Sequence, residues 1–476
     1  MKSEKILMQL KDGREFGRGE QIRLVFLLSV PAILAQITSI VMQYIDASMV
    51  GSLGAEASAS IGLVSSSTWL FSGVCGAVAS GFSIQAAHRI GGGKIAEARS
   101  IMRQSLLVAA AVSLLLALSG VLIGGKLPVW LGAAPEIWKD ASAYFIVFAC
   151  SLPLIQMNRL AGGLFQCSGD MRTPGALNIL MCFLDVVFNR FLIFPAQTIS
   201  VGGLAIPLPG AGLGVTGAAL GTALSELVTA VLMMGLLCLR SGVFRLKRGE
   251  SWKLEKKCIM RALRLAAPIG WENVMMCGAM VATTRVVAPL GAVAIAANSF
   301  AVTAESLCYM PGYGIGDAAA TLTGQSIGAG RYDLTRRFAK MAVWMGIVVM
   351  ALTGAAMFFG ASFMMSLLTP DMEIRRLGAE VLRIEVFAEP MYAASIVASG
   401  ALRGAGDTMV PSMMNFASIW FVRLPLAILL SGEYGLRGVW IAMCLELCFR
   451  GAIFLLRLYR EKWLAEAKKE QINAPL

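Results

Sequence analysis

Ile90-Gly91-Gly92-Gly93-Lys94 and Ile327-Gly328-Ala329-Gly330-Arg331 are two copies of one glycine-rich stretch, 237 positions apart. The same shift relates further identical residues over a long block: Pro31 and Pro268, Gly54 and Gly291, Arg99 and Arg336, Pro153 and Pro390, Gly169 and Gly406, Asp170 and Asp407, Pro174 and Pro411, and Asn178 and Asn415. A constant shift means that the two halves are copies without a relative insertion across this block. Duplication in a membrane protein is typical of two half-molecules that face each other across a central path, the arrangement of alternating-access carriers.

The composition places the chain in a bilayer. Hydrophobic residues make up 57% and charged residues 15% of the 476 positions, with a mean hydropathy of +0.71. Because a spanning helix needs about 20 mostly apolar residues, the apolar windows centred near residues 35, 72, 113, 152, 186, 226, 274, 309, 353, 391, 422 and 448 predict twelve spans. We therefore expect an all-α polytopic membrane protein with twelve transmembrane helices in two pseudo-symmetric six-helix lobes.

The net charge of +12 is distributed over alternate loops, which indicates topology and argues against a nucleic-acid partner. The basic residues concentrate in the second, sixth and eighth loops: Arg89, Lys94, Arg99 and Arg103; Arg240, Arg245, Lys247, Arg248, Lys253, Lys256 and Lys257; and Arg331, Arg336, Arg337 and Lys340. The first 23 residues are also basic, through Lys2, Lys5, Lys11, Arg14, Arg18 and Arg23, and no removable signal peptide is evident. We expect a multi-pass protein of the plasma (inner) membrane with both termini in the cytoplasm.

The longest charged stretch of the interior separates the halves. It predicts an N-terminal lobe at 1–240, a cytoplasmic linker at 241–260 and a C-terminal lobe at 261–476. The late spans match at a shift of 221 instead of 237, so the first half carries extra residues, which the segment 202–212 supplies as an external loop. The glycine-rich stretches predict tight interhelical turns, since neither follows a strand nor ends in the Lys-Ser/Thr of a phosphate loop.

Several motifs give the chain a resemblance to the multidrug and toxic compound extrusion (MATE) family over essentially its whole length. They are Pro31 with Gln36 and Asp46, Met49-Val50-Gly51, Leu53-Gly54-Ala55, Ala288-Pro289-Leu290-Gly291, Met310-Pro311, Gly314-Ile315-Gly316, Gly324-Gln325 and Leu402-Arg403-Gly404-Ala405-Gly406-Asp407-Thr408. The resemblance implies a V-shaped pair of helical bundles. It also implies export of organic, often cationic compounds in exchange for protons or sodium ions, with no cofactor; we expect a monomer among membrane lipids.

Acids inside spans cost at least a few kcal/mol and need a partner, a proton or a function. The resemblance implies that Asp46 couples substrate release to ion uptake; the alternative is a residue that fixes the outer end of its helix. Asp185 and Asn189 are four apart and therefore share a helix face. Their order is the reverse of the one the family often shows. By resemblance Thr222 adds a hydroxyl, and Na⁺ is a candidate ligand of Asp46, Asp185 and Asn189; alternatively, Asp185 only pairs with Arg190.

The second lobe carries Glu272, Glu305 and Glu389, which are candidates for coupling or for substrate binding. Some family branches place essential acids at positions that align with Met276 and Tyr392, and Glu272 and Glu389 lie about one turn before them. Residues expected to line the central cavity are Gln36, Gln43, Met275, Met276 and Tyr392.

The predicted function is antiport: a multidrug exporter of small amphipathic cations driven by H⁺ or Na⁺. A raised carboxyl pKa suits protons and converging neutral oxygens suit sodium, so the residues leave the coupling ion open. The alternative within transport is a lipid-linked saccharide flippase, for which Arg190, Arg423 and Arg450 would bind a pyrophosphate. An enzyme is not expected: the only histidine, His88, is predicted in a basic loop, and neither a metal cluster nor a nucleotide loop is evident.

Overall fold

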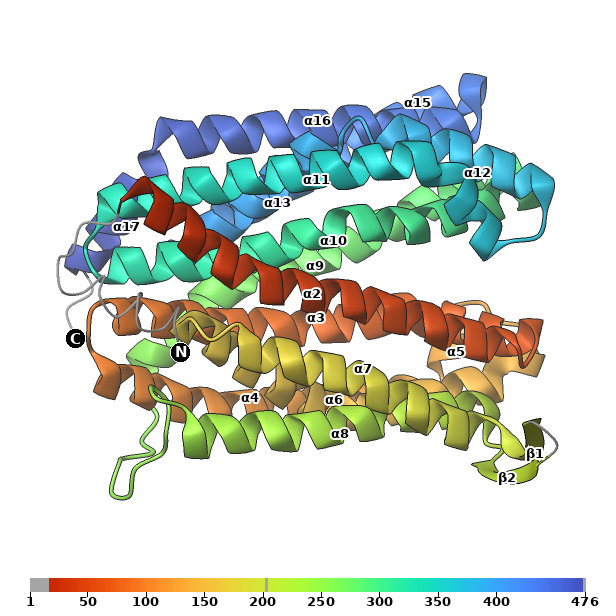
Figure 1. Cartoon of the computed structure of the whole chain (residues 1–476), viewed down its shortest axis with the longest axis horizontal. Coiled ribbons are helices and arrows are strands. Elements are labelled where there is room, and N and C mark those ends of the chain that lie inside the picture. The colour runs from red at the N-terminus through yellow and green to blue at the C-terminus, as the bar shows by residue number, and fades with distance from the viewer. Residues whose placement is uncertain (1–16, 202–203, 474–476) are drawn as a thin grey trace.

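The computed structural model describes residues 17–201 and 204–473, which form a long bundle of helices lying side by side (Figure 1). The first half comprises α2 (Arg18–Gly51), α3 (Ala55–Gly91), α4 (Ile95–Gly124), α5 (Leu127–Trp130), η1 (Pro135–Ile137), α6 (Trp138–Ser168), α7 (Arg172–Ile193), β1 (Pro195–Val201), β2 (Leu204–Ala211) and α8 (Gly214–Arg240). The second half comprises α9 (Lys256–Val287), η2 (Ala288–Leu290), α10 (Ala292–Gly328), α11 (Tyr332–Leu368), α12 (Met372–Glu385), α13 (Glu389–Gly404), α14 (Met409–Ser418), η3 (Ile419–Arg423), α15 (Leu424–Tyr434), α16 (Leu436–Arg460) and α17 (Lys462–Asn473).

The described residues contain twelve spans, six in each lobe, as predicted, when α12 and α13 are counted as one span. Eleven stretches of the described chain are long and apolar enough to cross a bilayer as one helix. The twelfth is the window near residue 391, which is divided into α12 and α13. Pro390 explains the break, because it has no backbone N–H and its ring crowds the carbonyl of the residue four positions earlier.

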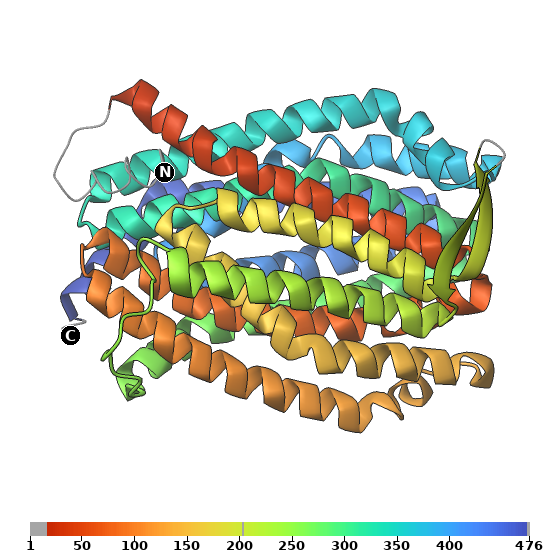
Figure 2. The ribbon, with the colours of Figure 1, turned by 60° about the horizontal axis from the view of Figure 1, so that its bottom comes forward.

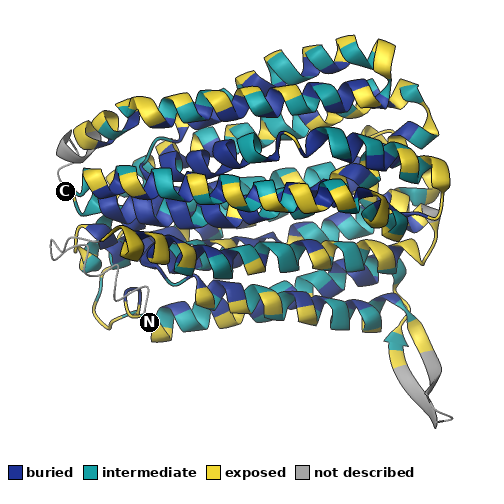
Figure 3. Cartoon of the chain, turned by 45° about the horizontal axis from the view of Figure 1, so that its top comes forward, coloured by how far each residue is buried: buried dark blue, intermediate teal, exposed yellow. Residues whose placement is uncertain are grey.

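The apolar surface matches a membrane environment. Leu115 and Leu122 on α4 and Phe359 and Phe363 on α11 are each more than 60% exposed. Exposed residues follow the outer faces of the peripheral helices, whereas the inner helices are largely buried (Figure 3). Such a surface is suited to lipid, because soluble proteins rarely expose large contiguous apolar patches.

The two ends of the bundle differ. One end carries the α3–α4 turn, the segment 241–255 and α17, and we call it the basic end; the other carries α5 and the β1–β2 hairpin, and we call it the hairpin end (Figures 1 and 2). The hairpin pairs β1 with β2 in antiparallel register, so the predicted external loop contains regular structure. Lys2, Lys5, Lys11 and Arg14 lie outside the described residues.

The basic second and eighth loops are much shorter than expected. Only 92–94 separate α3 from α4, and 329–331 separate α10 from α11, which confirms tight turns at both glycine-rich stretches. Arg99, Arg103 and their counterparts in the second half lie inside helices. The reason is that alanine, arginine and glutamate are good helix formers, and a helix can continue beyond the apolar window without breaking.

The first helix of each repeat packs on both lobes. Leu24, Val25 and Leu28 of α2 belong to the apolar core that includes α10, α11 and α13 of the second lobe, whereas the far end of α2 approaches α7 of the first. Reciprocally, Ala262 of α9 lies in the core of the first lobe. These two crossing helices therefore join the lobes by packing.

The lobes also meet at the basic end through a pseudo-symmetric contact, which we call the glycine crossing. His88 Nε2 donates to the carbonyl of Gly404 at 2.9 Å, and Gln325 Nε2 donates to the carbonyl of Cys167 at 2.7 Å. Each pair is the other pair moved by the repeat shift of 237. The prediction of His88 in a loop is wrong: it lies near the end of α3, where an imidazole can reach the opposite lobe.

Glycine is required at the centre of this crossing. A Cβ on Gly91 would collide with the carbonyl of Gln325, and a Cβ on Gly328 would collide with the carbonyl of His88. The helices α3 and α10 therefore approach backbone to backbone, which only a residue without a side chain permits.

We predict that Gly91→Ala and Gly328→Ala each lower stability by about 1–3 kcal/mol, because the added methyl group overpacks the crossing. The control is Gly235→Ala in α8, where an added Cβ meets nothing within 4 Å and alanine improves helix propensity. Thermal unfolding in detergent measures the effect. Equal melting temperatures for all three variants would contradict this account of the crossing.

Candidate functional site

Two helices of the first lobe bring Asp46, Asp185 and Asn189 together. Asp46 lies near the hairpin end of α2, and the other two lie one turn apart on α7. The side-chain amide of Asn189 donates to Asp46 Oδ1 at 2.9 Å and to Asp185 Oδ2 at 3.0 Å. One amide therefore bridges two carboxyl groups, and the reversed order of aspartate and asparagine does not separate them.

Close helix packing holds this amide in place. Gly221 of α8 contacts Asn189 so closely that a Cβ there would collide with Asn189 Oδ1. Ser225 Oγ donates to Asp185 Oδ1 at 3.3 Å, and Thr222 lies near the same carboxyl group, although its hydroxyl donates to the Ala218 carbonyl at 3.2 Å. The sequence prediction missed Ser225. It lies three residues after Thr222, on the same face of the helix, and a search for hydroxyl side chains at that spacing would have found it.

The first-lobe cluster is suited to a small cation. Asp185 and Asn189 are almost fully buried, Asp46 is half-buried, and the two carboxyl groups lie close enough to share a proton. Asn189 Oδ1 is buried without a hydrogen-bond partner among the described residues. Two like charges in an apolar site repel unless a proton or a metal cation neutralises one of them, and carboxylate and amide oxygens are ligands for hard cations.

Asp185 is not held by an arginine in the described parts of the chain. Arg190 instead stacks over Phe194, with its guanidinium carbon 5.0 Å from the ring centroid. This geometry disfavours the alternative in which Asp185 only neutralises Arg190.

A polar chain continues from this cluster toward the basic end. Thr229 lies one turn beyond Ser225 on α8, and its hydroxyl donates to the Ser225 carbonyl at 2.8 Å. Asn158 of α6 donates to Thr229 Oγ1 at 3.1 Å and to Glu226 Oε2 at 2.7 Å. A third carboxyl group is thereby connected to the cluster through hydrogen-bonding side chains, a connection that spacing along one helix could not reveal.

In the second lobe, Glu272 is engaged in an ion pair. Arg403 contacts both carboxylate oxygens at 2.8 and 2.6 Å, Ser412 donates to Oε2 at 2.6 Å, and Asn415 donates to Oε1 at 2.8 Å. These bonds stabilise the ionised form and connect α9 with α13 and α14. Glu272 therefore has a structural partner that the sequence did not indicate.

The other second-lobe acids gather around the break between α12 and α13, and we call this set the second-lobe acid cluster. Its members are Glu305, Glu385, Glu389 and Glu446, with Arg423 and Arg450. All four glutamates are buried. The carboxylate oxygens of Glu385 and Glu389 have no hydrogen-bond partner in the described chain.

Among the described residues, only Glu446 of this cluster is fully paired. Arg423 donates to it at 2.9 and 2.7 Å, Arg450 at 2.7 and 2.8 Å, and Ser418 donates as well. Four carboxyl groups thus face two guanidinium groups. Charge balance in an apolar interior requires protons or a cation on the remaining acids.

The π-helix η3 positions Arg423 for this pairing. Pro425 follows it and cannot donate a backbone hydrogen bond, so the helix widens by one residue before α15 begins. Arg450 also lies over Tyr392, 5.5 Å from the ring centroid, and Tyr392 contacts Tyr309 edge to face. Because Arg423 and Arg450 are committed to Glu446, they are poorly suited to a pyrophosphate, which weakens the flippase alternative.

The remaining residues expected in the cavity have varied surroundings. Gln36 hydrogen-bonds with Asp317 of α10, an intramembrane acid that the sequence prediction missed. Gln43 is exposed, Met276 is half-buried, and the carbonyl of Met275 accepts from Trp420 Nε1 at 3.2 Å. No group of three or more metal-ligating side chains occurs among the described residues.

Two helical lobes related by a repeat, with buried acids in each, define this protein as a polytopic membrane transporter. The chain belongs to the MatE family, which matches residues 31–191 and 268–429. The two matched blocks begin 237 positions apart, at the shift that relates the halves of the sequence.

Similar proteins extend over nearly the whole chain. A probable multidrug resistance protein NorM of Thermotoga maritima is 26% identical over 454 residues, covering 92% of each chain. The probable NorM protein of Idiomarina loihiensis is also 26% identical, over 473 residues, covering 94% of this chain and 96% of that protein.

Solved structures share the fold. An outward-facing multidrug resistance MATE transporter of the MOP superfamily superposes with a TM-score of 0.87 at 20% identity, covering 97% of this chain and 98% of that one. A MOP superfamily transporter from Pyrococcus furiosus, described as having a binding pocket of reversed polarity, gives 0.87 at 19% identity, covering 96% and 98%.

We predict that Glu446→Gln lowers stability by about 3–5 kcal/mol, because it removes the carboxylate that accepts hydrogen bonds from the half-buried Arg423 and the buried Arg450. The matched control is Glu380→Gln. Glu380 also faces two arginines, Arg376 and Arg437, but these are exposed, and such pairs contribute about 0–1 kcal/mol. Thermal unfolding of both variants decides; a larger loss for Glu380→Gln would contradict the assignment of Glu446 as the buried anchor.

Proposed function

We propose that this protein is a secondary active antiporter that exports small amphipathic, mostly cationic compounds in exchange for H⁺ or Na⁺. The relatives named as probable multidrug resistance proteins support the substrate class. The observation that carries the proposal is the Asn189 amide bridging Asp46 and Asp185, because it holds two acids in apolar surroundings with a free amide oxygen beside them.

The coupling follows from electrostatics. With Asp46 and Asp185 ionised, the first lobe attracts a cationic compound; when a proton or Na⁺ binds there, the attraction is lost and the compound is released. Asp46 lies on α2, which also packs on the second lobe. A change of charge at this cluster therefore alters the position of the two lobes relative to each other. Competition of two cations for one cluster is sufficient for exchange, since each lowers the affinity for the other by the same factor.

Alternating access requires the lobes to separate at one end and then at the other. We place the basic end in the cytoplasm, by the positive-inside rule, with the protein in the plasma (inner) membrane and both termini on the same side. In this scheme the glycine crossing is the closed cytoplasmic gate. The lobes are divided at the segment 241–260, and a single chain supplies both, so a monomer is sufficient.

The second-lobe acid cluster is proposed as a further protonation site. Glu305, Glu385 and Glu389 are buried beside a broken helix, and broken helices in transporters commonly lie at binding sites. Two protons shared among Glu305, Glu385 and Glu389 would balance the negative charge that Arg423 and Arg450 leave uncompensated. We assign a structural role to Glu272, because it forms an ion pair with Arg403.

We predict that Asp46→Asn and Asp185→Asn each reduce efflux of a fluorescent organic cation by about 5- to 150-fold, the range of typical coupling free energies. Efflux is measured in proteoliposomes with either a proton or a sodium gradient imposed. The gradient that drives the wild type and fails to drive the variants identifies the coupling ion.

The control is Glu136→Gln, which removes an exposed acid at the hairpin end. It tests whether the effect arises from the cluster or from the general loss of a negative charge. Wild-type rates for Asp46→Asn and Asp185→Asn under both gradients would refute the antiport proposal.

For the second lobe, we predict that Glu389→Gln impairs proton-driven efflux without lowering the melting temperature. A protonated carboxyl group and an amide have similar size and no charge, so the substitution preserves the resting state while removing the proton site. Thermal unfolding and efflux are measured on the same preparation. A large loss of stability would mean instead that Glu389 is ionised in this state.

A further inference from the structure

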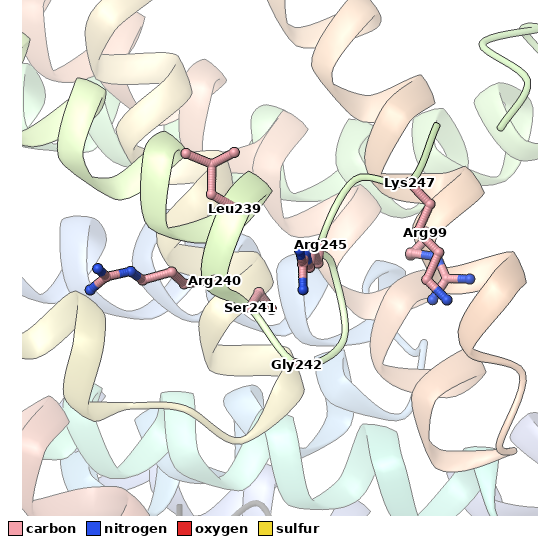
Figure 4. Close-up of a pocket in the computed structure, with 7 residues that line it drawn as sticks. All are labelled: Arg99, Leu239, Arg240, Ser241, Gly242, Arg245 and Lys247. Carbon is pink, nitrogen blue, oxygen red and sulfur yellow. The ribbon is translucent and has the colours of Figure 1, made fainter. Parts of the chain in front are cut away.

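A basic hollow lies at the basic end of the first lobe, outside the transport site. It has a volume of about 530 Å³ and is lined by Arg99, Leu239, Arg240, Ser241, Gly242, Arg245 and Lys247 (Figure 4). Four of these seven residues are cationic and none is acidic. The close-up shows Arg99 and Lys247 near each other on one side, with Arg245 facing them across the hollow and Arg240 extending on the far side.

The loop that forms the hollow is held in a defined shape. The Ser241 hydroxyl accepts from the backbone N–H groups of Val243 and Phe244 at 3.3 and 3.1 Å, and Leu246 N–H donates to the Cys238 carbonyl at 2.9 Å. Val243 and Phe244 are buried in the apolar core of the first lobe. The loop therefore has apolar anchors, and its basic side chains are left on the surface.

Three of these four cations have no acidic partner among the residues that the structure describes. Arg240, Arg245 and Lys247 are exposed and have no carboxylate within ion-pair distance in the described ranges. Glu250 of the linker instead pairs with Arg99, at 2.8 Å, and with Arg103. Burial raises the pKa of Glu250, but the hydrogen bond from Arg99 and the charges of Arg103, Arg99 and Lys247 outweigh it and keep the pKa below its ordinary value.

The second lobe has a corresponding corner. Arg336 and Lys340, the repeat counterparts of Arg99 and Arg103, form ion pairs with Glu461 at 3.3 and 2.9 Å. There the chain continues into α17, whose Glu466 contacts Arg457 at 3.2 Å. In the first lobe, Glu250 makes the corresponding contacts with Arg99 and Arg103. Arg240, Arg245 and Lys247 are additional to this pairing and have no ion-pair partner among the described residues.

The geometry points to a binding site for the phosphate group of an anionic phospholipid at this hollow. The site lies where α8 leaves the membrane, and Leu239 on its rim is 71% exposed, so acyl chains can pack beside the headgroup. Basic pockets at the ends of transmembrane helices are suited to such headgroups. Since the loop connects the two lobes, a bound lipid would fasten the linker to the first lobe.

The test is lipid binding to the full-length protein, measured by native mass spectrometry during titration with phosphatidylglycerol or phosphatidylcholine. The variant is Arg240→Gln/Arg245→Gln/Lys247→Gln. Each surface cation contributes about fivefold to the binding of anionic lipid, so the triple variant is expected to bind phosphatidylglycerol about 100-fold more weakly, with phosphatidylcholine unaffected. Arg245→Gln alone, expected to lose about fivefold, serves if the triple variant unfolds.

The matched control is Arg337→Gln/Lys462→Gln/Lys469→Gln, which removes three exposed cations at the same end without touching the hollow. It is expected to retain near wild-type affinity for phosphatidylglycerol. Equal losses in control and variant, or undiminished binding by the variant, would overturn the site. Full displacement of the lipid by inorganic phosphate at matched concentration would overturn the lipid as its ligand. None of these outcomes depends on transport.

Discussion

An ionised carboxyl group in a hydrocarbon layer must find an opposite charge, a proton or a cation, because water is not available to solvate it. The structure meets this constraint in different ways in its two lobes. In the first, one asparagine amide is shared between Asp46 and Asp185. In the second, two arginines neutralise Glu446 completely and leave Glu385 and Glu389 without hydrogen bonds among the described residues. Acids that are only partly satisfied are the ones that the proposed exchange of cations would use.

These clusters are connected mechanically because each repeat begins with a helix shared between lobes. The helix α2 carries Asp46 near one end and packs with its other end on the core of the second lobe. A local change of charge is thus applied to a long helix that packs on both lobes. Pro31 within α2 and Pro268 within α9 remove one backbone hydrogen bond each, which makes these helices able to bend at defined points.

Much of the architecture could be predicted, because duplication, hydropathy and proline positions act through local sequence. Twelve spans, the tight glycine turns and the shared face of Asp185 and Asn189 follow from periodicity. What could not be predicted depends on contacts between distant segments. The pairing of Glu272 with Arg403, the place of His88 at the lobe interface and the convergence of Glu385 on Glu389 across a helix break require the packed structure. Residue type alone gave no indication of which acids are satisfied.

The glycine crossing has a property of its own: it is isologous, since each half presents to the other the same patch that it receives. A closed two-fold dimer of identical subunits is held together by contacts of this kind. Each half of this chain therefore retains a self-complementary surface, although both halves now belong to one polypeptide. A substitution on one side of the patch therefore faces the unsubstituted counterpart on the other side. The two halves are consequently constrained to change together at the glycine crossing, whereas they diverge freely around their acids.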